Sequence, residues 1–541
     1  MKKIYTSLKI VLVVIGICES SIINAQTNTW TWVSGADTAW NPNDFCCSIP
    51  YVKDSTAPSA RAYSANWTDG SGNLWLFGGV TFNGIGNDLW KFDINTNKWT
   101  LLSGADTGTT VIYGKKGLAD AANIPGARDS AQSWTDNNGD FWLFGGNGID
   151  AYRNNGRLND LWKYSPSSNL WTWVAGSDSV WKKDQYVSLG TASPQNAPGA
   201  YARAIGWTGP ENNLWLLANA LWKYNISDNL WTCVPDTVLN KTDSCNYYGN
   251  LAPHQRMSAS AWLGKDSSLW LFGGFYYYNI FPCPTFSQND LWNYNTTTNT
   301  WGLMPPCSRG SYYPSYYSSQ GVYSPQNLPP VRVDAASWTD SLGNLWLFGG
   351  ASSVFNPCGM AGMDPGPISY YNDLLQYNVN LKQWAWVNGS DTANSPGVYG
   401  TQGLSSSDNT PGARAGAVSW TDKKGNLWLF GGYENSFIYP SGFYNDLWRY
   451  SPSLQGGILA TINAVKAIPL PVYPNPSNGN FTVDLPETTQ LSVYNTLGEL
   501  IVTENLPKGK QALNLANKPV GVYYLKANSN NGQQAVKLVV E

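Results

Sequence analysis

The stretch Asn-Leu-Trp-Leu-Phe-Gly-Gly at residues 73–79 decides the architecture of this chain. It occurs again, nearly unchanged, at 140–146, 344–350 and 426–432. A close variant stands at 268–274, and a copy that has lost its glycines stands at 213–219. An apolar segment repeated in this way indicates one structural unit repeated along the chain.

Each copy is the second of four segments in a longer pattern. The first segment carries an arginine, a run of small residues and a tryptophan, the third is related to Asn-Asp-Leu-Trp-Lys-Tyr, and the fourth contains another tryptophan. All four are short, rich in aromatic and β-branched residues and bounded by turn formers, which is typical of strands. Four antiparallel strands repeated around a circle predict the blades of a β-propeller.

The double glycine after an apolar strand, followed by an aromatic residue and a spaced tryptophan, resembles the kelch repeat. The resemblance covers residues 28–450. It implies a kelch-type propeller, and the six copies predict six blades. The strand and turn signals after residue 467 predict a small Ig-like β-sandwich, so the expected fold is all-β. The resemblance does not imply one activity, because such a fold hosts many functions.

The N-terminal segment 28–33, Asn-Thr-Trp-Thr-Trp-Val, matches the fourth segment of the second repeat at 169–174. The sixth repeat, 414–450, has the first three segments but no clear fourth. We therefore expect the N-terminal strand to complete the last blade. Closing the ring in this way removes exposed strand edges.

Residues 1–25 are expected to be a secretory signal, with Lys2 and Lys3 before an apolar run. The propeller is then expected over 26–452, a linker over 453–467 and a sandwich over 468–541. No later run is long and apolar enough to span a bilayer as a helix.

The tail resembles the type A C-terminal sorting domain of the Bacteroidota type IX secretion system. The residues that carry this resemblance are Tyr473, Pro474, Asn475, Pro476, Gly479, Phe481, Gly521, Tyr523 and Lys537. It implies that the type IX secretion machinery is a partner and that the protein is exported across both membranes, to the cell surface or the medium.

The composition argues against nucleic-acid binding and against a copper site. The 541 residues carry a net charge of −3, so no basic surface indicates nucleic acid as a partner. The only histidine, His254, cannot supply the two copper ligands that a resemblance to galactose oxidase would require, and we expect no metal or cofactor. Two disulfides fit the cysteine spacing, Cys233 with Cys245 and Cys283 with Cys307, but the sequence leaves the connectivity open.

The lengths of the connections predict a binding face. Links between the first and second strands, and between the third and fourth, are tight and suit turns. The other two kinds of link are long, and strand alternation places them on one face. Long loops in compact domains are usually functional.

Two kinds of residue on this face are candidates. The arginines Arg61, Arg128, Arg203, Arg256, Arg332 and Arg414 are expected to open the first strand of every blade, and either bind anionic groups or pair with aspartates at the start of the third strand. We favour pairing; the third blade lacks the aspartate, so Arg203 is expected to be unpaired. The aromatic ligand-binding candidates are Tyr276, Tyr277, Tyr278, Phe281, Tyr312, Tyr313, Tyr316, Tyr317, Phe437, Tyr439 and Tyr444.

These rings either bind sugars or proteins or pack on one another to hold the loops. A Ser-Trp-Thr-Asp-x-x-Gly-Asn-Leu-Trp motif, as at 419–428, resembles the Asp box of sialidases, although a hairpin turn is the better interpretation. The favoured function is a non-catalytic binding module for glycan or protein. The alternatives are a glycan-active enzyme that uses carboxylates and tyrosines on the loop face, and a structural or adhesive surface protein.

Overall fold

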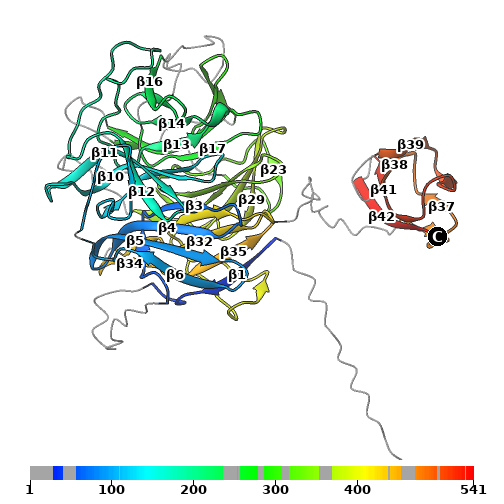
Figure 1. Cartoon of the computed structure of the whole chain (residues 1–541). Helices are drawn as coiled ribbons and strands as arrows, with labels where there is room; N and C mark the ends of the chain where they lie inside the picture. Colours follow the sequence, from blue (N-terminus) through cyan, green and yellow to red (C-terminus); the bar gives the residue numbers. More distant parts are fainter. Residues whose placement is uncertain are drawn as a thin grey trace, which may run out of the picture. The chain divides into compact units, whose positions relative to one another are not determined.

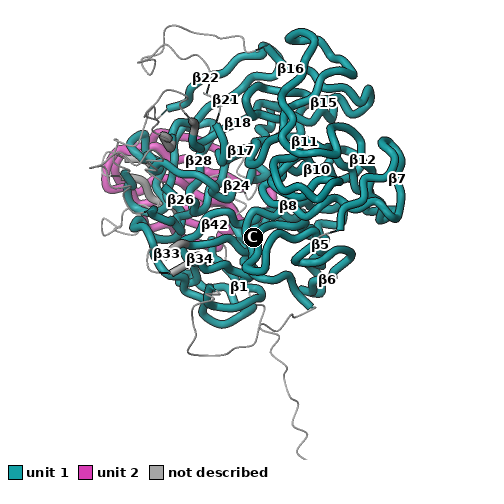
Figure 2. Tube along the Cα trace, turned by 90° about the vertical axis from the view of Figure 1, so that its left-hand side faces the viewer, with its two compact units in different colours: residues 1–456 teal, residues 457–541 magenta. Residues whose placement is uncertain are grey.

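The computed structural model describes residues 28–39, 56–108, 110–235, 253, 256–277, 285–305, 316–352, 368–436, 439–452, 470–495, 500–529 and 532–541. The chain divides into two compact units, Met1–Gly456 and Gly457–Glu541, coloured teal and magenta in Figure 2. The predicted disulfide partners Cys245, Cys283 and Cys307 and the lone His254 lie outside the described residues.

The described part of the first unit contains six antiparallel sheets of four or more strands, which follow one another along the chain (Figure 1). From the inner to the outer strand, the first blade contains β3 (Ala65–Thr68), β4 (Leu74–Thr81), β5 (Gly84–Asp93) and β6 (Lys98–Ser103), and the second contains β9 (Gln132–Thr135), β10 (Phe141–Ile149), β11 (Asn155–Ser165) and β12 (Leu170–Ala175). The third blade contains β13 (Ile205–Thr208), β14 (Leu214–Leu217), β15 (Leu221–Asn225) and β16 (Leu230–Val234), and the fourth contains β17 (Ser260–Leu263), β18 (Leu269–Phe272), β21 (Leu291–Asn295) and β22 (Thr300–Met304). The fifth blade contains β24 (Ala336–Thr339), β25 (Leu345–Phe348), β28 (Leu374–Asn378) and β29 (Gln383–Asn388), and the sixth contains β31 (Val418–Thr421), β32 (Leu427–Phe430), β35 (Leu447–Ser451) and β1 (Thr29–Ser34).

The N-terminal strand completes the sixth blade, as predicted. β1 pairs antiparallel with β35 (Figure 1). In this pairing Trp30 lies opposite Tyr450. The side chain of Trp30 is fully buried and contacts Phe348 of the fifth blade as well as Tyr450. The strand therefore contributes to the core between blades and does more than cover an edge.

A circle of indole hydrogen bonds joins the six blades. In each blade the tryptophan of the innermost strand donates its Nε1–H to the backbone carbonyl of the second-strand tryptophan in the next blade, at 3.0–3.2 Å. The pairs are Trp67–Trp142, Trp134–Trp215, Trp207–Trp270, Trp262–Trp346, Trp338–Trp428 and Trp420–Trp75. Because the last pair joins the sixth blade to the first, the ring is closed.

The unbroken apolar run in the repeated stretch follows from burial on both sides of each blade. On β4, Trp75 and Phe77 pack against the second blade, while Leu74 and Leu76 pack against the sixth. A strand covered on both faces has no solvent-facing side that would call for polar residues.

The glycine pair has a steric cause. Gly78 and Gly79 have φ of 62° and 98°, a left-handed region that glycine adopts most readily. A Cβ on Gly78 would lie 2.6 Å from the carbonyl oxygen of Arg128 in the next blade. At Gly78, inside β4, a residue without a side chain is therefore needed so that the second blade can approach.

In three blades a short additional strand lies outside the fourth strand. β7 (Ala119–Asp120), β23 (Tyr323–Ser324) and β30 (Ser405–Ser406) pair outside β12, β29 and β1. They belong to the long connection that enters each blade and cover its outer edge.

In the second blade the two long connections contact each other, as expected for connections that share one face. The tip of the β10–β11 hairpin bonds to the connection that leaves its blade, through Ala151 N–H and the carbonyl of Asp178 at 3.0 Å. Parts of these links form hairpins: β19 (Phe275–Tyr277) with β20 (Thr285–Ser287), β26 (Ala351–Ser352) with β27 (Ser369–Tyr370), and β33 (Tyr433–Ser436) with β34 (Tyr439–Phe443). The strand segments β2 (Arg61–Ala62) and β8 (Arg128–Asp129) and the 3₁₀ turn Pro210–Asn212 complete this unit.

The second unit is a sandwich of two sheets. One has the order β36 (Val472–Tyr473), β37 (Asn480–Leu485), β40 (Gly509–Asn514), and the other β39 (Leu500–Leu506), β38 (Thr489–Asn495), β41 (Gly521–Ser529), β42 (Gly532–Val540). Phe481, Val493 and Leu525 lie in the core between them. Across the described chain, no helix has the length and apolar character needed to cross a membrane.

Candidate functional site

Five of the repeated arginines are structural. They form buried ion pairs with third-strand aspartates: Arg61–Asp88, Arg128–Asp160, Arg256–Asp290, Arg332–Asp373 and Arg414–Asp446. In the last pair both guanidinium nitrogens contact the carboxylate, at 2.5 and 2.8 Å, and neither side chain is exposed. The pairing interpretation holds for these five residues.

Arg203 does not occupy the equivalent position, so that part of the prediction was wrong. It stands four positions before Trp207, whereas Arg61 stands six before Trp67. In the third blade the arginine position belongs to Tyr201, which donates a hydrogen bond to the carboxylate of Asp184. The expectation that Arg203 is unpaired was also wrong, because it forms an ion pair with Asp334 at 3.3 Å.

The position of Arg203 defines a feature that we call the axial ring. Its members stand four residues before the innermost-strand tryptophan of each blade and have φ of 54–64°: Tyr63, Ser130, Arg203, Ser258, Asp334 and Gly416. Each backbone N–H donates to the carbonyl of the ring member in the preceding blade, at 2.9–3.3 Å, and Tyr63 donates to Gly416. Six backbone hydrogen bonds thus close a circle at the propeller axis.

The side chains of the axial ring meet in a polar aromatic cluster. Arg203 and Tyr63 both bind one carboxylate oxygen of Asp334, at 3.3 and 2.9 Å. The guanidinium of Arg203 lies 4.4 Å from the centre of the Tyr63 ring. The hydroxyl of Tyr433 lies 2.9 Å from the Tyr63 hydroxyl, and Tyr370 packs edge-on against Tyr433. We call Tyr63, Arg203, Asp334, Tyr370 and Tyr433 the mouth cluster.

The cluster lies on the loop-rich face, because Tyr370 and Tyr433 belong to β27 and β33 of the long links. Burial and the charge of Asp334 raise the pKa of Tyr63, and burial raises the pKa of Tyr433. The carboxylate of Asp334 raises the pKa of Arg203. At neutral pH the cluster therefore presents neutral phenols and a guanidinium that is 35% exposed, while Asp334 is only 6% exposed.

Two further polar groups border the cluster. Asp129 accepts a hydrogen bond from the Ser130 hydroxyl at 2.7 Å, and burial raises the pKa of its carboxyl. Ser258 is 7% exposed, and its Oγ has no hydrogen-bond partner within the described part of the chain. Ser258 shares the backbone geometry of its neighbours in the axial ring. Its Cα–Cβ bond therefore points away from the ring on the same side as the Cα–Cβ bonds of Arg203 and Asp334.

The aromatic candidates divide into three groups. Tyr317 and Tyr444 are structural: Tyr317 donates to the carboxylate of Asp373 and stacks on Trp386, and the buried ring of Tyr444 lies 3.8 Å from the guanidinium of Arg414. Tyr316 is 52% exposed. Tyr276, Tyr277 and Tyr439 are placed only as strand backbone, and Tyr278, Phe281, Tyr312, Tyr313 and Phe437 lie outside the described residues.

The sequence contained a signal for the mouth cluster that residue type alone did not reveal. Counting four positions back from each innermost-strand tryptophan gives Tyr63, Arg203 and Asp334 in the first, third and fifth blades. Tyr433 directly follows the glycine pair of the sixth blade. An alignment by residue type matches Arg203 with the five paired arginines, and so conceals its neighbours in the axial ring.

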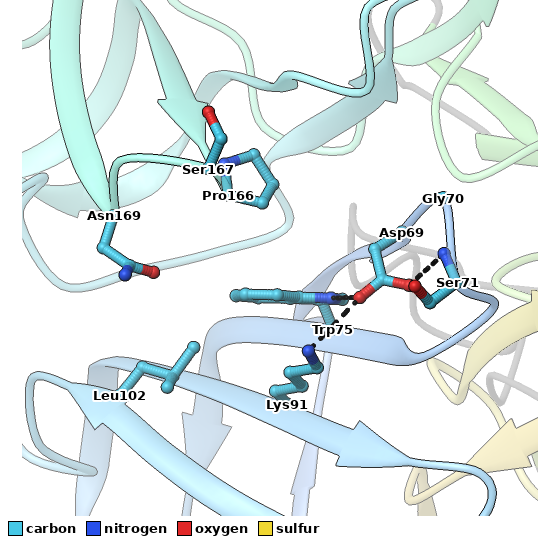
Figure 3. Close-up of a pocket in the computed structure, with 9 residues that line it drawn as sticks. All are labelled: Asp69, Gly70, Ser71, Trp75, Lys91, Leu102, Pro166, Ser167 and Asn169. Atoms are coloured by element: carbon cyan, nitrogen blue, oxygen red, sulfur yellow. Dashed lines mark hydrogen bonds and ion pairs between the residues drawn. The ribbon is translucent and has the colours of Figure 1, made fainter.

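A pocket of about 460 Å³ lies on the opposite face, between the β3–β4 hairpin and the β11–β12 turn (Figure 3). Trp75 lies there between Pro166 and Lys91, and donates its Nε1–H to Asp69 at 3.0 Å. Asp69 also accepts the backbone N–H groups of Ser71 and Asn73. The same contacts recur at Asp136, Asp340 and Asp422, so the Asp-box-like motif closes hairpins, as the turn interpretation predicted.

Within the described residues, no cluster of His, Cys, Asp or Glu side chains could hold a metal ion.

The motif residues of the tail are joined across its sandwich. The Asn475 side chain donates to the carbonyl of Lys537 at 2.6 Å and accepts the N–H of Val539 at 2.9 Å. Phe481 and Tyr523 are buried in the core. Gly479 has a φ of 95°, and a Cβ there would lie 2.5 Å from the Cα of Ala516. The two ends of the tail motif thus form one structural element.

Comparison with known proteins agrees with both units. Residues 471–541 match the family model described as the secretion system C-terminal sorting domain. The chain is 26% identical to kelch domain-containing protein 3 of Bos taurus over 44% of its own length and 52% of that protein. It is also 26% identical to leucine-zipper-like transcriptional regulator 1 of Mus musculus, over 41% of its length and 21% of that protein.

The chain thus spans about half the length, or less, of these relatives. A solved structure titled "Structure of YjhT" aligns with 72% of this chain and 95% of that chain, at 14% identity and a TM-score of 0.42.

Fold and tail together define a class, an all-β propeller protein with an appended sandwich for export. More particularly, the propeller is similar in sequence to kelch domain-containing proteins, and the tail matches a secretion system C-terminal sorting domain. This domain implies an interaction with the type IX machinery and export across the outer membrane to the cell surface or the medium.

Proposed function

We propose that the propeller is a non-catalytic binding module that takes a glycan at the mouth cluster. One observation carries this proposal. At the equivalent axial positions the second, fourth and sixth blades have Ser130, Ser258 and Gly416, so the fold needs no large side chain there. The odd blades nevertheless place Tyr63, Arg203 and Asp334 in the same left-handed conformation, which is unfavourable for the bulky side chains of Tyr63 and Arg203.

The chemistry of the cluster fits neighbouring hydroxyl groups of a sugar. The partly exposed guanidinium donates in a fixed plane, the carboxylate accepts, and the phenols do both. The ring of six backbone hydrogen bonds closes the axis beneath these groups. Pre-positioned polar groups beside aromatic rings are typical of small-ligand sites.

The test is binding of the full exported chain to a glycan array, followed by calorimetry on any sugar that binds. Arg203→Ala is expected to weaken binding by about tenfold or more, and Arg203→Lys to restore only part of it, because an ammonium cannot reproduce the planar fork. Lys98→Ala, on the exposed outer strand β6, is the control. Absence of sugar binding, or equal affinity of the Arg203→Ala variant, would overturn the proposal; binding of a surface protein instead would favour a protein ligand.

A second candidate, a glycan-active enzyme, is favoured by Asp129. Its carboxyl has a raised pKa and lies in the electrostatic field of Arg203, which also binds Asp334. Two carboxyl groups in different environments suit acid–base chemistry on a glycosidic bond. Turnover of a bound glycan that is lost in Asp129→Asn would replace the binding proposal with this one.

A further inference from the structure

The hairpin between β10 and β11 extends well beyond its blade. Its strands have 9 and 11 residues, against 4 and 5 for β14 and β15 in the next blade. Three hydrogen bonds tie it to the connection that leaves the blade: Ala151 N–H to Asp178 O, Trp181 N–H to Arg157 O, and Val180 N–H to Asp150 Oδ2. The two segments therefore form one ordered projection of the loop-rich face.

Trp181 on this projection combines an exposed side chain with an unfavourable backbone conformation. Its side chain is 61% exposed, and its φ of 61° is unfavourable for a bulky residue. A Cβ on Gly156 would lie 2.5 Å from Nε1 of Trp181, so the hairpin carries a glycine where the indole approaches. Strain retained at an exposed aromatic residue that buries little surface is a signature of function.

Cations that make no ion pair within the described residues lie on the same two segments as this indole. The guanidinium of Arg157 lies 6.0 Å from the Trp181 ring, Arg153 is exposed at the hairpin tip, and Lys182 and Lys183 follow Trp181. None of these four makes an ion pair within the described part of the chain, although the whole chain carries a net charge of −3.

The aspartates near this indole interact with other groups. Asp150 is fully buried and accepts the N–H groups of Tyr152 and Asn154. Asp184 binds the Tyr201 hydroxyl and the N–H of Gly199. The charge of Asp178 acts on Lys116. The charged side chains of this projection that are exposed, Arg153, Lys182 and Lys183, are therefore all cationic.

We propose that this crest, formed by Tyr152, Arg153, Arg157, Trp181, Lys182 and Lys183, binds an acidic polysaccharide. The apolar face of a sugar ring stacks on the flat, exposed indole, and carboxylate or sulfate groups pair with the surrounding guanidinium and ammonium groups. The crest uses none of the mouth-cluster residues, so the inference does not depend on what the mouth binds.

The experiment uses the full chain and three probes: polygalacturonate for carboxylates, dextran sulfate for sulfates, and dextran as the neutral control. At least one anionic probe is expected to bind, and binding should weaken as salt rises. Trp181→Gly should reduce affinity about tenfold or more while leaving the melting temperature unchanged or higher, because glycine accepts the left-handed φ. Arg203→Ala should retain this binding, which separates the crest from the mouth.

Three outcomes would overturn the proposal. They are no binding to either anionic polymer, equal affinity for dextran, and an unchanged affinity of Trp181→Gly for a bound probe. Polyglutamate tests stacking directly, because it is anionic but has no sugar ring. Binding of polyglutamate as tight as that of the polysaccharide would show that charge alone acts, and would replace the glycan with an acidic protein segment.

Discussion

The side chain of Asn409 donates a hydrogen bond to the carbonyl of Trp30 at 3.1 Å, across 379 positions of sequence. The same bond joins Asn123 to Trp171, Asn196 to Trp231 and Asn327 to Trp384, each time from the connection that enters a blade to its fourth strand. The N-terminal strand is thus held as an ordinary member of its sheet, even though the remainder of that sheet comes from the sixth repeat.

Removing the indole of the closing strand should weaken the whole propeller. Trp30→Ala deletes a fully buried side chain that packs on Phe348, Trp448 and Tyr450, and is expected to lower the free energy of unfolding by about 3–5 kcal/mol. Denaturant unfolding of the exported chain measures this. Leu381→Ala, at a residue that is 53% exposed, is the control, with an expected change of less than about 0.5 kcal/mol. Equal stability of both variants would contradict a structural role for β1.

Breaking a buried ion pair should lower the free energy of unfolding far more than breaking the partly exposed pair of Arg203 and Asp334. Arg414→Leu leaves Asp446 charged, buried and without its cation, with an expected loss of about 3–5 kcal/mol. Adding Asp446→Leu should recover part of that loss, because no charge then remains unpaired. Arg203→Leu removes a guanidinium that is 35% exposed, and Asp334 keeps its hydrogen bond from Tyr63, so the loss should be only about 1 kcal/mol or less. A similar loss for Arg203→Leu and Arg414→Leu would refute the distinction between scaffold and mouth.

The hairpin aspartate Asp69 should make the fold sensitive to acid. Burial tends to raise the pKa of Asp69, but hydrogen bonds from Asn73 and Trp75 outweigh it, and the pKa is lowered overall. A lowered pKa in the folded state adds stability above the unfolded value of about 4, and this stability disappears as pH falls through the folded value.

Asp69→Asn is therefore expected to be less stable than the wild type at pH 7, with a smaller difference at pH 3. Denaturant unfolding at both pH values measures it, with the exposed Asp408→Asn as reference. A difference that is the same at both pH values would show that ionisation of Asp69 is not involved.

Export should depend on the contact that joins the two ends of the tail motif. Asn475→Ala removes hydrogen bonds to the backbone of Lys537 and Val539, each worth about 0.5–1.5 kcal/mol. A loosened sandwich is expected to reduce the amount of protein at the surface and in the medium. Immunodetection in cell fractions measures this, with Asn478→Ala as a neighbouring control; normal export of the Asn475→Ala protein would argue against this contact as a requirement.

Much of the fold could be predicted because it is written in local, repeated patterns. The stretch at 73–79 and its copies specify strands, and the unmatched segment at 28–33 specifies closure, because a blade without its fourth strand leaves an open edge. The pairing of Arg61 with Asp88 and its four counterparts could be predicted for the same reason, since both partners recur with every blade.

The candidate sites could not be predicted in this way, because they lie where the repeat is broken. Arg203, Tyr63 and Asp334 come from three different blades, and only a closed ring brings them to one axis. Similarly, the sequence shows an arginine at 157 and a tryptophan at 181, but the contact between them depends on two connections folding against each other. Sequence by itself determined the strands, the blade number and the exported tail, because those follow from short-range periodicity; the tertiary structure alone decided which irregular side chains meet, because such contacts depend on how the ring closes.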